Sequence, residues 1–287
     1  MAAKPQTKIA NLLEFDQEAI RANEMKVARE SDEEILTRLR ERFTVLTDMT
    51  RAVRQGNIRA MIVSGPPGVG KSYGVEDVLF RDGIFDTLGE RKPKYEIVKG
   101  ALSAIGLYTK LYEFSEKGNV IVFDDADNIF FDDVCLNLLK GALDSGKKRF
   151  ISWNTDSRIL RSEGVPDRFE FKAGAIFISN IKFAHIKSKK LKDHLDALES
   201  RCHYIDLEMD TTREKILRIK QVITECGMLN EYDFEEEHEE RLVNFIVDNQ
   251  ARLRELSLRT VLKTADLCRA FPDRWEAMAR NTIMRRA

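Results

Sequence analysis

One glycine-rich stretch constrains this chain more than any other feature of its sequence. The stretch is Gly65-Pro66-Pro67-Gly68-Val69-Gly70-Lys71-Ser72, and Tyr73 follows it. The residues before it, 58–64, form a mostly apolar run with β-branched members, which predicts a buried strand that ends at Gly65. The residues after it, 72–80, are predicted to form a helix. A strand, a glycine-rich turn and a helix in this order are typical of a loop that binds phosphate groups.

Each residue type in this phosphate loop has a chemical reason to be there. Glycines let the backbone turn its N–H groups inward around a phosphate, where any Cβ atom would crowd the ligand. Lys71 would bring a mobile cation to the β- and γ-phosphates, and the Ser72 hydroxyl would ligate Mg²⁺ as the helix begins. The loop, together with Tyr73, is therefore predicted to bind a nucleoside triphosphate with Mg²⁺, as in kinases, GTPases or transporters. The alternative is a glycine-rich turn that only happens to contain Lys-Ser.

Composition places the chain among soluble globular proteins. Its 287 residues are 43% hydrophobic and 33% charged, enough for one large α/β core and a smaller module. Lys and Arg number 47 against 48 Asp and Glu, so no overall basic field indicates nucleic acid, although a local basic patch stays open. No apolar run approaches the roughly 20 residues of a membrane span, and the N-terminus lacks a signal-peptide core. We expect a cytoplasmic protein, or one in the host cytoplasm if phage-encoded, with no membrane partner.

The cysteines and histidines predict neither a disulfide framework nor a zinc site. The four cysteines are scattered without paired spacing, which is typical of reduced residues in a cytosolic protein. Residues His185, His194, Cys202 and His203 lie close in sequence, but their spacing matches no zinc pattern.

Alternating strand and helix patterns predict an α/β fold. The predicted strands are residues 58–64, 95–98, 120–123, 175–180 and 203–207, with a hairpin at 150–153 and 169–171. The predicted helices beside them are residues 104–115, 134–142 and 187–199, and only helices are predicted later, near 211–226, 234–248, 257–271 and 273–285. This order predicts a five-stranded parallel sheet flanked by helices, plus a C-terminal all-helical lid domain. The predicted domains are an N-terminal helical extension at 1–55, a nucleotide-binding α/β domain at 56–208 and the lid at 209–287.

Four further features follow the loop in order. Residues 120–125 form an apolar strand that ends in two carboxylates, and Asn180 closes a later apolar strand. Arg201 stands just before the last predicted strand, and Arg259 lies in the helical region. Together with the loop, these features resemble the AAA+ family of ring-forming ATPases over about residues 58–270.

The resemblance implies a role for each of these residues. Asp124 would hold the Mg²⁺ shell and Asp125 would orient the attacking water. Asn180 would be the sensor 1 residue, on a strand between the loop strand and the strand that carries the acids. Arg201 would be an arginine finger reaching a neighbouring subunit's nucleotide, and Arg259 would be the sensor 2 arginine of the lid. The family also implies ATP as the nucleotide and a homo-oligomeric ring, with a hexamer expected.

Plainer interpretations stand beside these roles. Asn180 would then be a strand-end turn residue, Arg201 a surface ion-pair residue, and Arg259 an exposed arginine on an amphipathic helix. Asp125 also departs from the family, whose usual pair is Asp-Glu, because its side chain reaches roughly 1.5 Å less. Slow hydrolysis or a rearranged site is the expected consequence. Asp127 and Asp132 are predicted to be turn and helix-capping residues.

Two branches of the family share further features with the chain. The Asp-Asp-Ala-Asp run at 124–127 and the Ser-Arg-Cys run at 200–202 resemble clamp loaders. About 80 residues follow the last predicted strand, too few for a clamp-loader collar in addition to a lid. Small phage and plasmid replication or recombination ATPases share this compact layout.

The sequence leaves the substrate open. Lys99-Gly100 lies where AAA+ rings commonly face the pore, and it lacks the aromatic residue of protein-threading members. A phosphate backbone would suit Lys99 and the basic residues Lys147, Lys148, Arg149, Arg158, Arg161 and Arg168, unless these are ordinary solvated charges. We expect an ATPase that remodels or loads a macromolecule, with DNA slightly favoured. The alternatives are a protein-remodelling chaperone that binds a protein partner through the N-terminal helices, and a slowly hydrolysing nucleotide-gated switch.

Overall fold

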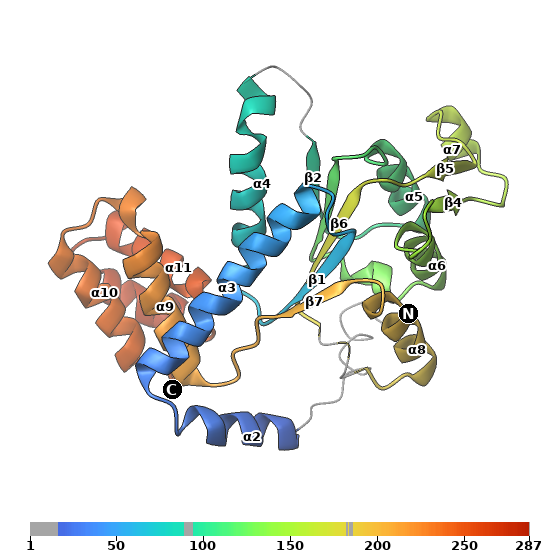
Figure 1. The fold of residues 1–287 in the computed structure, drawn as a ribbon. Coiled ribbons are helices and arrows are strands. Elements are labelled where there is room, and N and C mark those ends of the chain that lie inside the picture. The colour runs from blue at the N-terminus through green and yellow to red at the C-terminus, as the bar shows by residue number, and fades with distance from the viewer. Residues whose placement is uncertain (1–16, 89–93, 182, 184–185, 287) are drawn as a thin grey trace. The chain divides into compact units, whose positions relative to one another are not determined.

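The structure is a computed structural model that describes residues 17–88, 94–181, 183 and 186–286 (Figure 1). The first sixteen residues of the predicted N-terminal extension, and His185, lie outside these ranges. The described chain forms two compact units. The sheet unit comprises residues 42–65 and 71–207, and the helical unit comprises residues 17–41, 66–70 and 208–286.

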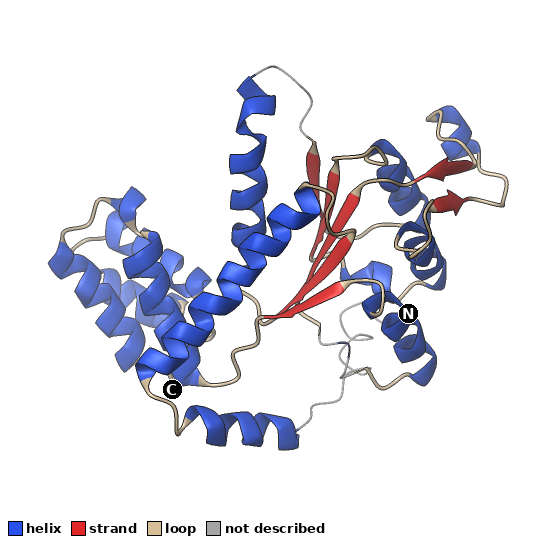
Figure 2. Ribbon diagram, in the orientation of Figure 1, coloured by secondary structure: helices blue, strands red, loops and turns tan. Residues whose placement is uncertain are grey.

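The sheet unit is built on five parallel strands, which confirms the predicted fold class (Figure 2). In spatial order they are β2 (Tyr95–Lys99), β3 (Val120–Asp124), β6 (Gly174–Ser179), β1 (Ala60–Ser64) and β7 (His203–Asp206). The register pairs Ser64 with Ser179 and Lys99 with Asp124, so the carboxyl ends of the strands meet at one edge. The strand that ends before Asn180 lies between the loop strand β1 and the acid-bearing strand β3, as predicted.

Helices cover both faces of this sheet. They are α4 (Lys71–Leu88), α5 (Ala104–Glu113), the 3-10 turn η1 (Asp127–Phe130), α6 (Asp133–Ala142) and α8 (Lys189–Glu199). Successive strand residues point to opposite faces, because side chains alternate along a strand. Ile121 and Phe177 therefore join one core with α5, α6 and α8. Val122 and Ile176 join another with α4 and residues 42–54 of α3 (Asp32–Arg54).

The predicted hairpin is present as β4 (Phe150–Ser152) paired antiparallel with β5 (Arg168–Glu170). The polar segment between these strands, which carried no predicted element, contains the short helix α7 (Arg158–Ser162). Ser157 caps this helix through its hydroxyl, which accepts a hydrogen bond from the Leu160 amide. Helix α4 extends to Leu88, past the predicted end at residue 80.

The helical unit has its own hydrophobic core. Its elements are α2 (Gln17–Val27), residues 32–41 of α3, α9 (Thr212–Cys226), the 3-10 turn η3 (Asn230–Tyr232), α10 (Glu236–Asp248), α11 (Leu258–Ala270) and α12 (Trp275–Thr282). Leu242, Val261 and Trp275 are among the buried residues at its centre. Helices α9, α10, α11 and α12 match the four helices predicted for the C-terminal region. The predicted domain bounds stay a prediction, and α3 contributes residues to both units.

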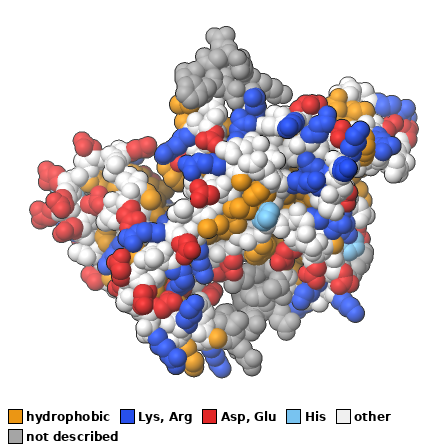
Figure 3. Space-filling model, viewed as in Figure 1, with side chains coloured by type: hydrophobic (Ala, Val, Ile, Leu, Met, Phe, Trp, Pro, Cys, Tyr) orange, Lys and Arg blue, Asp and Glu red, His pale blue; other side chains and the backbone are white. Residues whose placement is uncertain are grey.

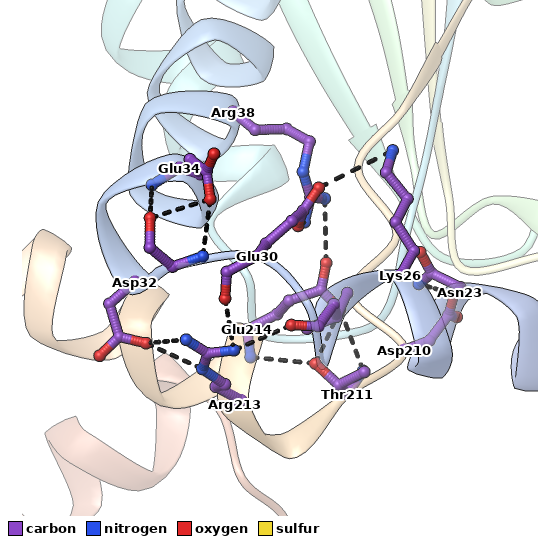
Figure 4. Close-up of polar contacts among 12 residues, drawn as sticks. Asn23, Lys26, Glu30, Asp32, Glu34, Arg38, Asp210, Thr211, Arg213 and Glu214 are labelled. Carbon is purple, nitrogen blue, oxygen red and sulfur yellow. Dashed lines mark hydrogen bonds and ion pairs between the residues drawn. The ribbon is translucent and has the colours of Figure 1, made fainter.

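A polar junction joins the N-terminal helices of this unit to α9 (Figure 4). The carboxylate of Glu214, which is fully buried, closes the capping box of Thr211 and accepts a 3.0 Å bond from Arg38. Arg213 donates to the carbonyl oxygens of Val27 and Glu30, at the end of α2. Because these charges are paired and hydrogen-bonded, their burial is tolerated.

Candidate functional site

The two residues expected to hold a metal ion touch each other. Ser72 lies in the first turn of α4, and Asp124 is the last residue of β3. The Ser72 hydroxyl donates to Asp124 Oδ1 over 2.8 Å, and Asp124 is only 4% exposed. A hydroxyl and a carboxylate are hard oxygen donors of the kind that Mg²⁺ prefers, so the residues present fit this ion. Lys99 Nζ lies 3.7 Å from the other carboxylate oxygen of Asp124.

Lys71 connects the loop to the sensor position. Its ammonium donates to the Gly65 carbonyl oxygen over 2.6 Å and to Asn180 Oδ1 over 2.8 Å, and the residue is 5% exposed. The Asn180 Nδ2 group donates to Asp125 Oδ1 over 2.7 Å. The amide orientation follows from its neighbours, since the ammonium requires an acceptor and the carboxylate a donor. The structure thus brings together Lys71, Asn180 and Asp125.

Asp125 has an unusual backbone conformation. Its φ angle is 53°, in the left-handed region, and its side chain is exposed beyond the end of β3. Its N–H donates to the Ile178 carbonyl oxygen over 3.1 Å, which fixes the turn against β6. Aspartate tolerates this conformation better than most residues. The turn directs Asp124 and Asp125 to different partners, although they are consecutive in the chain.

Asp127 lies in the 3-10 turn η1, and its side chain makes a contact that the prediction of a turn residue does not include. It is partly buried, and its Oδ1 accepts a 2.6 Å hydrogen bond from the hydroxyl of Ser179, the residue before Asn180. Burial raises the pKa of this carboxyl, against the lowering by the Ser179 bond. No local pattern predicts this contact, because it depends on the position of β6 beside β3. Asp132 does cap α6, as predicted, by accepting a hydrogen bond from the Cys135 amide.

The tip of the phosphate loop, residues 66–70, packs within the helical unit. Leu258 N donates to the Gly68 carbonyl oxygen over 2.9 Å. A Cβ atom on Gly68 would lie 2.7 Å from Ser257 Cβ, and the φ angle of Gly68 is 72°, so this position needs glycine. The Ser257 hydroxyl and Glu255 Oε1 are buried and have no hydrogen-bond partner within the described ranges. Sequence reasoning missed both residues, because no local pattern links them to the loop.

The remaining loop residues take less specific positions. Pro67 is exposed, Pro66 and Gly70 are half-buried, and Val69 is buried. Tyr73, one of the predicted nucleotide-binding residues, is 71% exposed on α4.

The two predicted arginines belong to different units of the chain. Arg259 is exposed in the first turn of α11, two residues after Ser257. Arg201 follows α8, and its guanidinium donates to the Ala197 carbonyl oxygen over 2.5 Å. Its Nε atom is buried without a hydrogen-bond partner in the described part of the chain. Their roles as finger and sensor 2 stay predictions.

One predicted contact with a phosphate backbone is wrong. Arg149 is buried, and its guanidinium donates to the carbonyl oxygens of Ala142 and Ala173 over 3.0 Å each. Burial lowers the pKa of Arg149 to about 10. Its neighbours Lys147 and Lys148 are exposed, so only they remain from that basic run.

The hairpin keeps an exposed basic and aromatic surface. The Arg168 guanidinium lies 4.3 Å from the centre of the exposed Phe150 ring, while Arg158 is exposed on α7 and Arg161 pairs with Asp156. Figure 3 shows Lys and Arg side chains on the visible side of this region, with acidic side chains among them.

No helix within the described ranges has the length and apolar character to cross a bilayer.

Comparison with known proteins identifies one relative of high coverage. No protein-family model matches the chain. It is 36% identical over 253 residues to the "Uncharacterized 36.7 kDa protein in nrdC-mobD intergenic region" of Enterobacteria phage T4, across 88% of this chain and 76% of that protein.

Two solved structures match at low identity. A replication initiator DnaA bound to AMPPCP and single-stranded DNA is 13% identical with a TM-score of 0.42, over 83% of this chain and 64% of that one. PCH-2 of C. elegans is 14% identical with a TM-score of 0.34, over 94% of this chain and 68% of that one. The chain thus spans less than two thirds of the DnaA chain.

Proposed function

This chain belongs to the family of the 36.7 kDa protein of Enterobacteria phage T4, and we propose that it is a Mg²⁺-dependent ATPase of the AAA+ type. The observation that carries the proposal is the set of contacts from Ser72 to Asp124 and from Lys71 through Asn180 to Asp125. These contacts support the proposal because they bring an ammonium, a hydroxyl–carboxylate pair and a second carboxylate together at the carboxyl edge of a parallel sheet. Ligands of open α/β sheets bind at this edge.

The chemistry follows from these side chains. Lys71 donates to phosphate oxygens, and the Ser72 hydroxyl and Asp124 hold Mg²⁺, which neutralises charge on the phosphates when bound. Asp125 accepts a hydrogen bond from the attacking water and orients it. Asn180, which donates a hydrogen bond to Asp125, holds that carboxylate in the orientation needed to bind the water. In phosphoryl transfer, most of the rate acceleration comes from positioning of the reactants and electrostatic stabilisation, and little comes from covalent chemistry.

The decisive test compares Lys71→Ala with Lys117→Ala. Lys117 is an exposed lysine in the turn before β3, so its loss controls for a change of net charge. We expect Lys71→Ala to lose ATP binding and phosphate release, while Lys117→Ala keeps ATP binding and basal phosphate release. Equal ATP binding and turnover in wild type and Lys71→Ala would exclude the proposal.

We place the working site at a subunit interface of a homo-oligomeric ring, with a hexamer expected. The support is that, within the described residues, the Arg201 guanidinium donates to the Ala197 carbonyl oxygen and not to the acids or Asn180, as expected of a finger that serves a neighbour. Arg201→Ala should lose turnover, by on the order of 10³- to 10⁵-fold, and keep ATP binding. Mixing it with Lys71→Ala subunits should restore part of the turnover. Without restoration, Arg201 acts within its own subunit or not at all.

DNA is the substrate that we favour, in the cytoplasm of an infected host cell. Lys147, Lys148, Arg158 and the Arg168–Phe150 stack supply cations and an aromatic face for a nucleic acid strand. Single-stranded or duplex DNA should raise the ATPase rate, and the stimulation should fall steeply with salt. An unchanged rate would favour the chaperone alternative.

A nucleotide-gated switch is the second candidate. It is supported by the short side chain and left-handed backbone of Asp125. Multiple turnovers per subunit, measured as phosphate released at saturating ATP, would exclude it.

A further inference from the structure

We infer that Asp127 is a positioning residue that fixes the sensor Asn180 through the hydroxyl of Ser179. The inference rests on the proposed ATPase function and adds a residue to its site. Asp127 lies in η1, three residues after the presumed metal ligand Asp124. It belongs to the sheet unit, as do all of its partners named below.

One hydroxyl organises the chain on both sides of Asn180. The Ser179 hydroxyl donates to Asp127 Oδ1 over 2.6 Å and accepts a bond from the Ile181 N–H over 3.0 Å. Ser179 is fully buried. The residues before and after Asn180 are thus tied to the same oxygen atom, which leaves the intervening backbone little freedom.

The next strand completes this arrangement. The Ser64 hydroxyl, at the end of β1, donates to the Ile181 carbonyl oxygen over 3.2 Å. Ser64 and Ser179 also face each other in the register of β1 and β6. The sensor turn is therefore held from one side by Asp127 and from the other by the strand that leads into the phosphate loop.

The Asp127 bond has the features of a strong one. A hydroxyl that donates to a carboxylate forms a short, charge-assisted hydrogen bond, and this bond is partly removed from water. Burial raises the pKa of Asp127, and the Ser179 bond opposes that rise by favouring the carboxylate.

The consequence for the site concerns the position of the Asn180 side chain. Asn180 bridges Lys71 and Asp125 through two bonds of 2.8 and 2.7 Å. Both bonds depend on where the short asparagine side chain leaves the backbone. Because a displacement of about 1 Å can cost on the order of 10²-fold in rate, a loosened sensor turn would weaken turnover without removing any group that binds phosphate.

The test compares Asp127→Ala, Asp127→Asn and Ser179→Ala. An asparagine keeps an oxygen that can accept the Ser179 bond, whereas alanine does not. We expect Asp127→Ala and Ser179→Ala to lower kcat by about 10- to 100-fold with little change in ATP affinity, and Asp127→Asn to keep most of the kcat. The double variant Asp127→Ala with Ser179→Ala should be no slower than the worse single variant, because both substitutions remove the same hydrogen bond between Ser179 and Asp127.

The matched control is Asp132→Ala. Asp132 is a nearby carboxylate that accepts a bond from the Cys135 amide at the start of α6, so its loss weakens a helix cap. It should lower the melting temperature and leave kcat unchanged. If Asp127→Ala does not fold, Ser179→Ala alone must still show the drop in kcat with ATP affinity kept.

Three results would overturn the inference. An Asp127→Asn variant as slow as Asp127→Ala, with an altered pH–rate profile, would make Asp127 a charge-dependent catalytic group. Unchanged kcat in both alanine variants, beside an active wild type, would remove Asp127 and Ser179 from the site while leaving the ATPase function intact. A wild type that neither binds nor hydrolyses ATP would remove both proposals together.

Discussion

At one end of the phosphate loop the Lys71 ammonium and the Ser72 hydroxyl donate to oxygens of the sheet unit, whereas the tip at Gly68 packs against residues 255–258 of the helical unit. At the first end, the Lys71 ammonium and the Ser72 hydroxyl both form hydrogen bonds. The tip is closely packed, yet two polar atoms beside it, Ser257 Oγ and Glu255 Oε1, are buried without partners.

The two ends of one short loop therefore have different roles: the Lys71–Ser72 end holds reacting groups, and the Gly68 tip is a packing contact. Buried polar groups that are satisfied hold reacting groups in place, which is what a site for phosphoryl transfer requires. Buried polar groups without partners lower stability. Substitutions at the sheet end should therefore change turnover, and substitutions at the tip should mainly change stability.

Within this comparison of the two ends of the loop, the largest effect is expected for Asp125→Asn. The variant keeps the size of the side chain and removes the charge that would orient the water, so turnover should fall on the order of 10²- to 10⁴-fold. ATP binding should be retained, because Lys71 and Ser72 are unchanged. Phosphate release and binding of a labelled ATP analogue measure the two properties. Asp132→Asn, which still caps α6, is the control; undiminished turnover in Asp125→Asn would remove this carboxylate from the mechanism.

Gly68→Ala is expected to have the next largest effect. Its methyl group would lie 2.7 Å from Ser257 Cβ and 3.2 Å from Glu255 Oε1, and the residue would keep a φ angle of 72° that alanine rarely adopts. We expect a loss of about 1–3 kcal/mol in the free energy of unfolding. Chemical denaturation measures it. Gly56→Ala is the control, since its φ angle is also positive but nothing lies within 4 Å of the added atom.

A second substitution should repair part of that damage. Ser257→Gly removes the two atoms closest to the new methyl group, at 2.7 and 2.8 Å. The double variant should be more stable than Gly68→Ala alone, although the backbone strain remains. If the two changes are simply additive, the loop tip does not pack on Ser257 in solution.

The smallest effect is expected for Ser257→Ala. This change deletes a buried hydroxyl without a partner and keeps the packing of Cβ, so the free energy of unfolding should rise by about 1 kcal/mol. The melting temperature, followed by circular dichroism, checks it. A marked fall would mean that the hydroxyl has a partner in solution.

Much of this arrangement was predictable because it depends on local patterns. Strands β1, β3 and β6 carry mostly apolar runs, and the carboxyl ends of β3 and β6 bring Asp125 and Asn180 together once the strand order is known. Ser31 and Glu34, three residues apart, form a capping box through reciprocal bonds, which is also a local pattern. These features depend on residues that are close in the chain or on the parallel register.

The rest depends on contacts that no local pattern contains. Arg149 follows two exposed lysines, and only the tertiary structure shows that its guanidinium turns inward to two carbonyl oxygens. Asp127 resembles a turn residue until β6 places Ser179 beside it. Gly68 and Ser257 are far apart in sequence, so their contact follows only from the fold.

Because strand side chains alternate between two cores, the position of the site residues is coupled to correct packing of the sheet. Loss of one residue within β3 would shift Asp124 and Asp125 along the sheet edge, and it would also turn Ile121 and Val122 toward the wrong faces. Such a chain would fail to fold before it could present misplaced acids. Deletions in β3 should therefore be absent from functional variants, whereas the acids themselves can be exchanged without loss of the sheet.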